Sequence, residues 1–384
     1  MKVIAIVVAA AAALAAVAAS LLRLLVRRVV GVEPRRKTVT VRRVGDDIEM
    51  PKSALTLAAG NYGLWFGEQF EHHALIGPVA ASDEHRVIRR VLKTTAPIST
   101  EPFEAQWTGH VMSGPTEIDP DWEDVAVPLR DGILAPAWLF RGDSPDAPWV
   151  IHVQGIRTSR LVTLRSVEVA QRAGLTSLVI TYRGSGDGPA ASASTLGQRE
   201  WRDLADSVAY ARARGAASIY VVAWSMGAGL ALELLRQKPD AFDKLVLIAP
   251  ATNWRRIIRH GVRGVGLPLF TATVVTWALG SRPASRLIGM AAPLDIDQLD
   301  WGQNLTTGVP ALVIHSSGDE EIPFQITRDF VAAHPNVTLV EATAAPHGWE
   351  ANVDPEVFRS ALISWFASPG PPTSANAGRD RTSL

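Results

Sequence analysis

Ser225 stands in a short segment whose residue types suit a nucleophilic serine. Residues 223–229 read Ala-Trp-Ser-Met-Gly-Ala-Gly, between a β-branched run at 219–223 and an apolar helical pattern at 226–237. A sharp strand-to-helix turn lifts a serine hydroxyl above the strand end and accepts only small residues where strand and helix approach each other. Ala223 stands where this pattern usually has glycine. We therefore predict that Ser225 is a nucleophile presented at such a turn.

Two backbone N–H groups are candidates for stabilising the negative charge that attack by Ser225 would create. The Met226 N–H would lie at the N-terminus of the following helix, where the helix dipole adds to it. A second donor is expected after the apolar run 149–153, where Gln154-Gly155-Ile156-Arg157 follows. Gly155 permits close approach of the backbone, so we expect the Ile156 N–H to complete an oxyanion hole. Gln154 stands at the position where a loop with this role often carries a histidine before the glycine.

An acid and a base follow Ser225 in the order that such a site requires. Asp319 lies in a loop after the apolar run 311–315, with Glu320 as the second candidate, and His347 follows the run 337–341. Histidine can take the hydroxyl proton near neutral pH and return it to the leaving group, while a carboxylate holds its tautomer. The chain has 9 histidines, and the order serine, acid, histidine singles out His347 as the base and Asp319 as its orienting carboxylate.

Other groups that carry chemistry elsewhere have simpler interpretations here. His152 lies within a strand pattern and is expected in the core. His72 and His73 lack partners at metal-ligand spacing, so we expect no metal there. The glycines of residues 182–188 do not fit a dinucleotide-binding loop and no P-loop lysine follows, so we expect a turn. No cofactor is required.

From residue 125 onward, short β-branched runs alternate with helical patterns, which indicates βαβ units. An Asp-Gly turn joins the first two runs, so the sheet should begin antiparallel. The predicted fold class is α/β, an eight-stranded and mostly parallel sheet flanked by helices. The predicted strands are 125–129, 134–140, 149–153, 177–182, 219–223, 244–248, 311–315 and 337–341. The predicted helices are 162–172, 196–214, 226–237, 326–333 and 355–366.

We expect a catalytic domain at 125–368, preceded by an accessory region at 32–124 and followed by a disordered tail at 369–384 that is rich in Pro, Ser, Gly and Ala. The interval 253–305 is too long for a simple crossover and is predicted to be a cap. Arginines alternate there with Ile and Val at helical spacing. A helix packed on the core with a solvated basic face and a lipid-facing lid both fit this pattern.

Residues 1–31 are predicted to be a membrane anchor, because 3–22 are almost uninterrupted apolar residues, about one bilayer in length. Two alternatives are a cleaved signal peptide, since Ala16-Val17-Ala18 has a small-x-small pattern, and a buried Ala-rich helix. Arginines cluster just downstream of the apolar stretch, while only Lys2 precedes it. This charge bias favours a cytoplasmic catalytic domain, with export as the alternative.

The composition excludes several classes of protein. The 384 residues are 47% apolar and 20% charged, enough for one large core. Basic and acidic residues number 38 each, so no overall field favours nucleic-acid partners. The chain has no cysteine, which excludes disulfides and thiolate catalysis.

Residues 125–366 resemble the α/β-hydrolase superfamily, in its esterase, lipase and serine-aminopeptidase-like branch. The resemblance rests on the Tyr-Arg-Gly loop, the Ser225 turn, Gly-Asp-Glu-Glu-Ile-Pro at 318–323 and His347-Gly348. The whole chain is similar to membrane-anchored α/β hydrolases of actinobacteria, which carry a segment like Asn-Tyr-Gly-Leu-Trp-Phe at 61–66. The resemblance implies the catalytic roles of Ser225, Asp319 and His347, but not the substrate.

These observations favour a serine hydrolase that cleaves small or lipid-like acyl esters through an acyl-enzyme. A serine peptidase or amidase of the same fold would use the same intermediate. A non-catalytic, membrane-tethered binding protein is the alternative of another class. The oligomeric state is left open.

Overall fold

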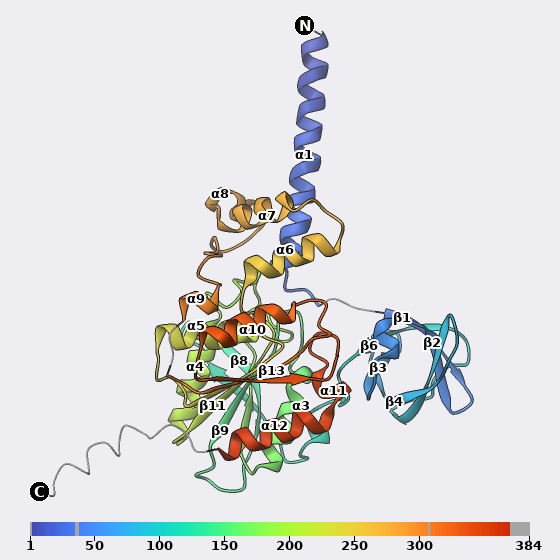
Figure 1. The fold of residues 1–384 in the computed structure, drawn as a ribbon, viewed down its shortest axis with the longest axis vertical. Coiled ribbons are helices and arrows are strands. Elements are labelled where there is room, and N and C mark those ends of the chain that lie inside the picture. Colours follow the sequence, from blue (N-terminus) through green and yellow to red (C-terminus); the bar gives the residue numbers. More distant parts are fainter. Residues whose placement is uncertain (1, 35–37, 306–307, 369–384) are drawn as a thin grey trace, which may run out of the picture.

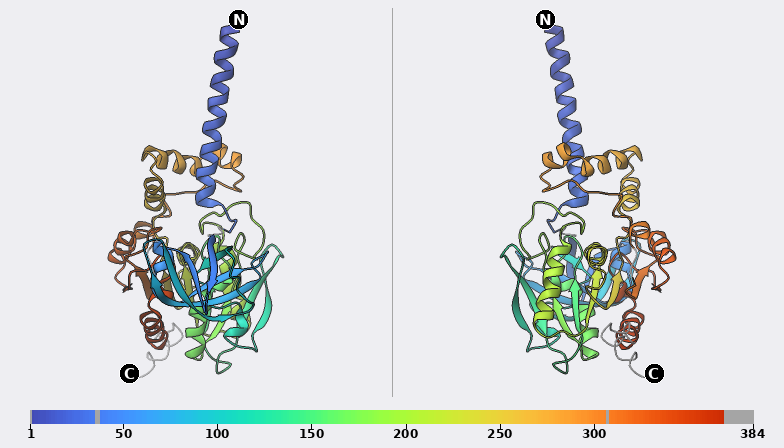
Figure 2. Two further views of the ribbon diagram at one scale, coloured as in Figure 1. Left: turned by 90° about the vertical axis from the view of Figure 1, so that its right-hand side faces the viewer. Right: turned by 90° about the vertical axis from the view of Figure 1, so that its left-hand side faces the viewer.

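The computed structural model describes residues 2–34, 38–305 and 308–368. A long helix leads into a domain built on a mixed sheet, with helices stacked above one end of the sheet and a separate small barrel at its side (Figure 1). The predicted tail at 369–384 lies outside the described residues. Figure 2 shows that the long helix points away from the rest of the molecule in both views.

The main sheet has eight strands in the order β14-β13-β12-β11-β9-β10-β8-β7. The pairs from β14 to β10 are parallel, whereas β8 pairs antiparallel with both β10 and β7. The predicted fold class is thus confirmed, including the antiparallel start. The strands are β7 (Glu123–Pro128), β8 (Leu134–Phe140), β9 (Trp149–Val153), β10 (Thr176–Val179), β11 (Ile219–Trp224), β12 (Lys244–Ile248), β13 (Ala311–Ser316) and β14 (Val337–Ala342).

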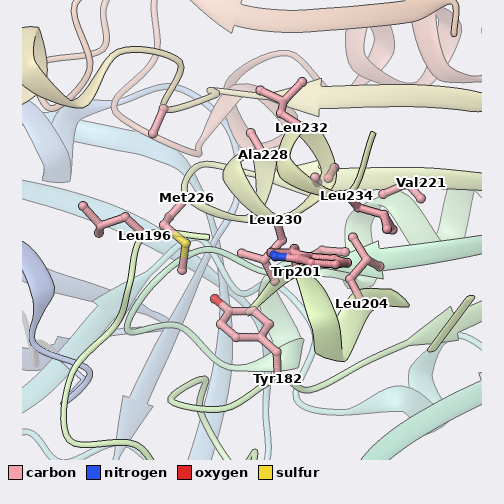
Figure 3. Close-up of a cluster of buried hydrophobic side chains, with 14 of the residues drawn as sticks. Tyr182, Leu196, Trp201, Leu204, Val221, Met226, Ala228, Leu230, Leu232 and Leu234 are labelled. Atoms are coloured by element: carbon pink, nitrogen blue, oxygen red, sulfur yellow. The ribbon is translucent and has the colours of Figure 1, made fainter. Parts of the chain in front are cut away.

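Helices cover both faces of this sheet because its central strands are buried on both sides. Val221 and Val222 are neighbours in β11, yet they belong to separate apolar clusters, since successive strand residues point to opposite faces. One face is covered by α3 (Leu164–Arg172, after the 3-10 turn η2, Arg160–Thr163) and α12 (Pro355–Ala367, after α11, Glu350–Val353); the other by α4 (Trp201–Ala213), α5 (Gly227–Gln237) and α10 (Phe324–Ala333). Figure 3 shows the cluster beneath α5, in which Met226, Tyr182 and Trp201 lie among leucines.

Residues 38–108 form a closed six-stranded barrel, although their sequence shows no sustained period. Its strand order is β1-β2-β5-β4-β3-β6, with β6 returning to β1. Closure leaves no free sheet edge. The elements are β1 (Thr38–Val44), β2 (Asp47–Pro51), the short α2 (Ala54–Leu57), β3 (Tyr62–Phe66), β4 (His72–Ser82), β5 (Arg86–Thr94) and β6 (Phe103–Thr108); the 3-10 turn η1 (Pro115–Glu117) leads on to the sheet.

The interval between β12 and β13 contains α6 (Trp254–Gly264), α7 (Phe270–Gly280), α8 (Arg282–Leu287) and α9 (Trp301–Asn304). The first three lie above the carboxyl ends of the strands, beside the long N-terminal helix α1 (Lys2–Val30) (Figure 1). The apolar stretch Ile6–Val30 of α1 has a mean hydropathy of 2.2 and is long enough to cross a bilayer, a test that a signal sequence also passes. The membrane anchor is therefore still a prediction.

Candidate active site

Ser225 occupies the turn between β11 and α5, with its backbone in the left-handed region at φ 52°. A non-glycine residue adopts this conformation only under strain, and such strain is typical of functional sites. Close packing enforces the turn: a Cβ on Gly227 would lie 2.7 Å from the Gln154 carbonyl oxygen. Ala223, in place of the usual glycine, is fully buried in β11. A methyl group is therefore accommodated at this point of the turn.

The structure brings together the three side chains that the sequence nominated. The Ser225 hydroxyl lies 2.8 Å from His347 Nε2, and His347 Nδ1 lies 2.6 Å from Asp319 Oδ2. Each residue follows a strand of the parallel part of the sheet: Ser225 follows β11, Asp319 follows β13 and His347 follows β14. Parallel strands place their carboxyl ends at one edge, which is why three distant segments meet there.

Asp319 is held as an ionised acceptor. Its Oδ1 accepts hydrogen bonds of 2.8 Å from the N–H groups of both Glu321 and Ile322. Its Oδ2 accepts from His347 and also from His315 Nε2 at 2.9 Å. Burial alone would raise the pKa of Asp319, but the facing histidines and their hydrogen bonds outweigh it and hold the pKa well below its usual range. Glu320, the second candidate, is exposed.

The pKa of His347 is shifted in the opposite direction. Burial alone would lower the pKa of His347, but the adjacent Asp319 carboxylate more than compensates, so the pKa rises above its ordinary value. The imidazolium form is thus stabilised beside Ser225. A histidine whose protonated form is stabilised in this way is suited to accept a hydroxyl proton. His347 is neutral only toward alkaline pH.

The loop after β9 lies against Ser225 as the oxyanion-hole prediction requires. A Cβ on Gly155 would be 3.1 Å from the Ser225 Cβ, so only glycine fits without a shift. Among the described residues, no backbone carbonyl accepts from the N–H of Ile156 or of Met226. Both groups therefore remain candidates for binding an oxyanion, and their role stays a prediction.

The Tyr182–Gly188 segment, expected to be a simple turn, also supports this loop. The Tyr182 hydroxyl donates to the carbonyl oxygen of Gly155 at 2.9 Å, and the buried Gln154 amide donates to Ser185 Oγ at 3.0 Å. Arg183 anchors the turn by pairing with the buried carboxylate of Asp203. Gln154 thus replaces the usual histidine as a buried structural residue.

A cavity of about 370 Å³ opens onto Ser225 and His347. This volume lies within the range of small-molecule sites. Its wall is largely aliphatic, and besides His347 its charged lining residues are Arg28, Arg157, Glu320 and Glu321. An apolar group can therefore be bound next to the hydroxyl of Ser225.

The barrel supports the loop that carries His347. The ring of Trp349, two residues after His347, lies 4.6 Å from the ring of Tyr62 in β3. The Asn352 side-chain amide donates to the backbone oxygens of Asn61 at 2.6 Å and Gly109 at 3.0 Å. The accessory region is thus in direct contact with the segment that follows His347.

Sequence reasoning missed two buried residues beneath the site, His315 and Glu350. His315 donates to Asp319 and bonds Thr327 Oγ1 at 2.7 Å. Burial raises the pKa of Glu350 to about 8. The ligand atoms of His315, Asp319 and Glu350 lie within 4.8 Å of one another. An ion bound there would compete with the histidine contacts of Asp319.

The remaining histidines that the sequence singled out lie elsewhere. His152 is buried in β9, where its ring nitrogens bond Ser166 and Ser177 at 2.9 and 3.2 Å. His73, in the barrel, bonds the His110 carbonyl at 3.0 Å and packs on Trp65. His72 lies beside the exposed Glu71.

Comparison with known proteins agrees with this architecture. Residues 148–265 match the family described as alpha/beta hydrolase fold, and residues 40–108 match a domain of unknown function, DUF8805. An esterase from Pyrococcus furiosus superposes with a TM-score of 0.51 at 19% identity, over 66% of this chain and 95% of the esterase. A second crystal form of it gives 0.51 at 21% identity, over 66% and 92%. A search of curated proteins found no match.

At these identities the esterase shares the fold, and nothing about substrate follows from it. The likeness of the whole chain to membrane-anchored hydrolases of actinobacteria also stays a prediction. The family match, by contrast, includes the strand, turn and helix around Ser225. Residues 123–367 therefore have the α/β-hydrolase fold, and 148–265 of them match the family model.

Proposed function

We propose that this protein hydrolyses carboxylic esters through an acyl-enzyme on Ser225. The observation that carries the proposal is the hydrogen-bonded series from Ser225 through His347 to Asp319, open to an apolar cavity. The strained backbone at Ser225 and the N–H groups beside it add to this argument.

Each step of the proposed reaction has a residue that would perform it. Ser225 Oγ attacks the acyl carbon while His347 Nε2 takes its proton, and the N–H groups of Met226 and Ile156 bind the developing oxyanion. The bond to the alcohol then breaks, and the alcohol leaves with the proton from His347. Water attacks the acyl-enzyme with His347 again as the base, which releases the acid and restores Ser225. Asp319 stabilises the imidazolium in both halves.

A fluorophosphonate probe tests the nucleophile directly. We expect it to label the folded protein at Ser225 and to leave Ser225→Ala unlabelled. Hydrolysis of p-nitrophenyl acetate should be lost in the same variant. A well-folded wild-type protein that is neither labelled nor active would overturn the proposal and favour a binding protein. Because an esterase and a peptidase both form the acyl-enzyme, the probe does not distinguish them. Hydrolysis of aminoacyl anilides, tested in parallel, does.

We also propose that α1 remains attached as an anchor and that the catalytic domain faces the cytoplasm. The support is the arginine cluster that follows the apolar stretch. A carboxyl-terminal fusion to a fluorescent protein should be bright, and a fusion to alkaline phosphatase, which needs export, should be inactive. The opposite pair of results would refute this topology. The intact mass of the purified protein tests whether α1 is cleaved.

A further inference from the structure

Part of the wall of the cavity above Ser225 comes from the N-terminal helix. Leu25 and Val29 of α1 line the cavity together with Ile257 of α6 and Val275 of α7. These side chains offer no hydrogen-bond donors or acceptors, so this wall favours a hydrocarbon group. A helix expected to serve only as a tether is thus part of the site.

The carboxyl end of α1 is built into the catalytic domain. Val26 and Val30 are buried in its core. The Val30 carbonyl accepts from the Ser194 N–H at 2.8 Å. Arg157, which directly follows Ile156, donates to the carbonyl oxygens of Arg27 at 2.6 Å and Gly31 at 2.7 Å. The position of α1 and that of the loop after β9, residues 154–157, are therefore linked.

The uncovered part of α1 matches the thickness of a bilayer. The described side chains from 4 to 21 are exposed, and Leu22 is the first that packs against the domain. Eighteen helical residues span about 27 Å, close to the roughly 30 Å of a hydrocarbon core. With this stretch in the bilayer, Leu25 and Val29 lie just below the membrane surface.

The face of α7 agrees with that depth. Phe270, Val274 and Trp277, spaced on one side of the helix, are 69%, 39% and 62% exposed. In both views α7 and α8 lie beside α1 (Figure 2), and α7 contacts it. Arg282 and Arg286 of α8 are exposed nearby. Aromatic and basic side chains together are typical of a surface that meets lipid headgroups.

We propose that the cavity wall formed by α1 and α6 is the binding site for the acyl chain of a bilayer-resident ester, which reaches Ser225 along α1. This inference rests on the proposed ester hydrolysis for its chemistry, but not for the binding site itself. The ester carbonyl would lie at Ser225, and the hydrocarbon chain would lie against Leu25, Val29 and Ile257.

A bulky residue at Leu25 tests the site, and its neighbour provides the matched control. Leu24 is 64% exposed and does not line the cavity. In the full chain reconstituted into vesicles, Leu25→Trp should lower the ratio of kcat/KM for p-nitrophenyl palmitate over p-nitrophenyl acetate by about tenfold or more. Leu24→Trp should leave the ratio at the wild-type value.

A second readout detects binding without hydrolysis. Palmitic acid carrying a diazirine, incorporated into the same vesicles and irradiated, should crosslink to the α6 peptide. The crosslink should be lost in Leu25→Trp and kept in Leu24→Trp. Because α6 lines the cavity and is not part of the helix expected to cross the bilayer, general labelling of α1 by lipid does not imitate this result.

The two readouts separate the two proposals. A crosslink to α6 that depends on Leu25, in a protein that cleaves no ester, would support the site and overturn the hydrolysis. Ester cleavage with the same palmitate preference in both tryptophan variants, and no α6 crosslink that depends on Leu25, would overturn the site alone. The absence of any α6 crosslink in the wild-type protein would also overturn it.

Discussion

The two loops that flank Ser225 are held by different parts of the chain, neither of which belongs to the main sheet. The His347 loop rests on the barrel through the Tyr62–Trp349 ring contact and the Asn352 hydrogen bonds. The loop after β9, which carries Ile156, is tied to α1 through Arg157. The first contact is made by packed rings and a buried amide, whereas the second depends on one arginine at the end of a helix. One loop is thus tied to the barrel. The other, besides its bonds to Tyr182 and Ser185, is tied to a helix that is expected to lie in a bilayer.

The largest effect is expected at Asp319, which holds His347 beside Ser225. Asp319→Asn should lower kcat by roughly 10⁴-fold, because an amide favours the wrong tautomer of His347. The change is measured with p-nitrophenyl acetate, and circular dichroism checks the fold. Asp240→Asn, at an exposed aspartate between α5 and β12, is the matched control and should be near wild type. A loss of less than tenfold in Asp319→Asn would mean that the acid is elsewhere.

On the barrel side, Trp349→Ala should destabilise the protein and lower kcat. Trp349 is half-buried, so the free energy of unfolding should fall by about 2 kcal/mol. Denaturation by urea measures it. Trp365→Ala, at a half-buried tryptophan of α12, supplies the comparison. If the two variants lose equal stability and equal activity, the barrel has no specific effect on the His347 loop.

On the α1 side, Arg157→Gln should reduce kcat for soluble esters by roughly tenfold, since a small displacement of an oxyanion donor slows acyl transfer. Gly31→Ala approaches the same contact from the helix, because a Cβ there would lie 2.9 Å from the Arg157 guanidinium and 2.5 Å from the Arg27 carbonyl oxygen. Both variants should lower kcat by a larger factor than they change KM. Wild-type kcat in both would show that the tie is only structural.

The pH profile addresses the triad that the two loops share. Since His347 must be neutral to act as a base and its pKa is raised, kcat/KM should increase with pH. The midpoint of this increase should lie above the value of about 6.5 for an ordinary histidine. Initial rates from pH 5.5 to 10 measure it. A midpoint below 6.5 would contradict the effect of Asp319 on His347.

The smallest effect is expected at Glu350, below the His347 loop. With a pKa of about 8 this carboxyl group is mostly protonated at pH 7, so Glu350→Gln replaces one neutral group by another of the same shape. The free energy of unfolding should change by less than about 1 kcal/mol. A much larger loss at pH 7 would show that the group is charged there.

Local patterns were enough to locate the sheet and the three residues now seen in hydrogen-bonded contact. β8, β9 and β12 begin and end where the short apolar runs predict. For β9 and β12 the reason is that parallel strands buried on both faces have near-continuous apolar sequences. The order of Ser225, Asp319 and His347 along the chain was the pattern that predicted the site. His315 could have been noticed, since it precedes Asp319 by four residues at the end of the same strand.

Other features depend on contacts that no local pattern encodes. In the barrel, β2 and β6 alternate between buried and more exposed residues over only five or six positions, and β4 carries register shifts against β5, so the sequence shows no sustained period there. The tie between Arg157 and α1 joins residues 126 and 130 positions apart. The support of His347 by the barrel likewise joins Asn352 to Asn61 over 291 positions. Such pairs become visible only when the chain is folded.

The bond between Arg157 and the end of α1 has a consequence for the membrane in which the helix is expected to lie. Transmembrane helices respond to hydrophobic mismatch by tilting. A tilt of α1 would displace the carbonyl groups that Arg157 holds, and with them the loop that carries Ile156. The lipid composition of the bilayer, through its thickness, would then act on turnover as an effector that never enters the site.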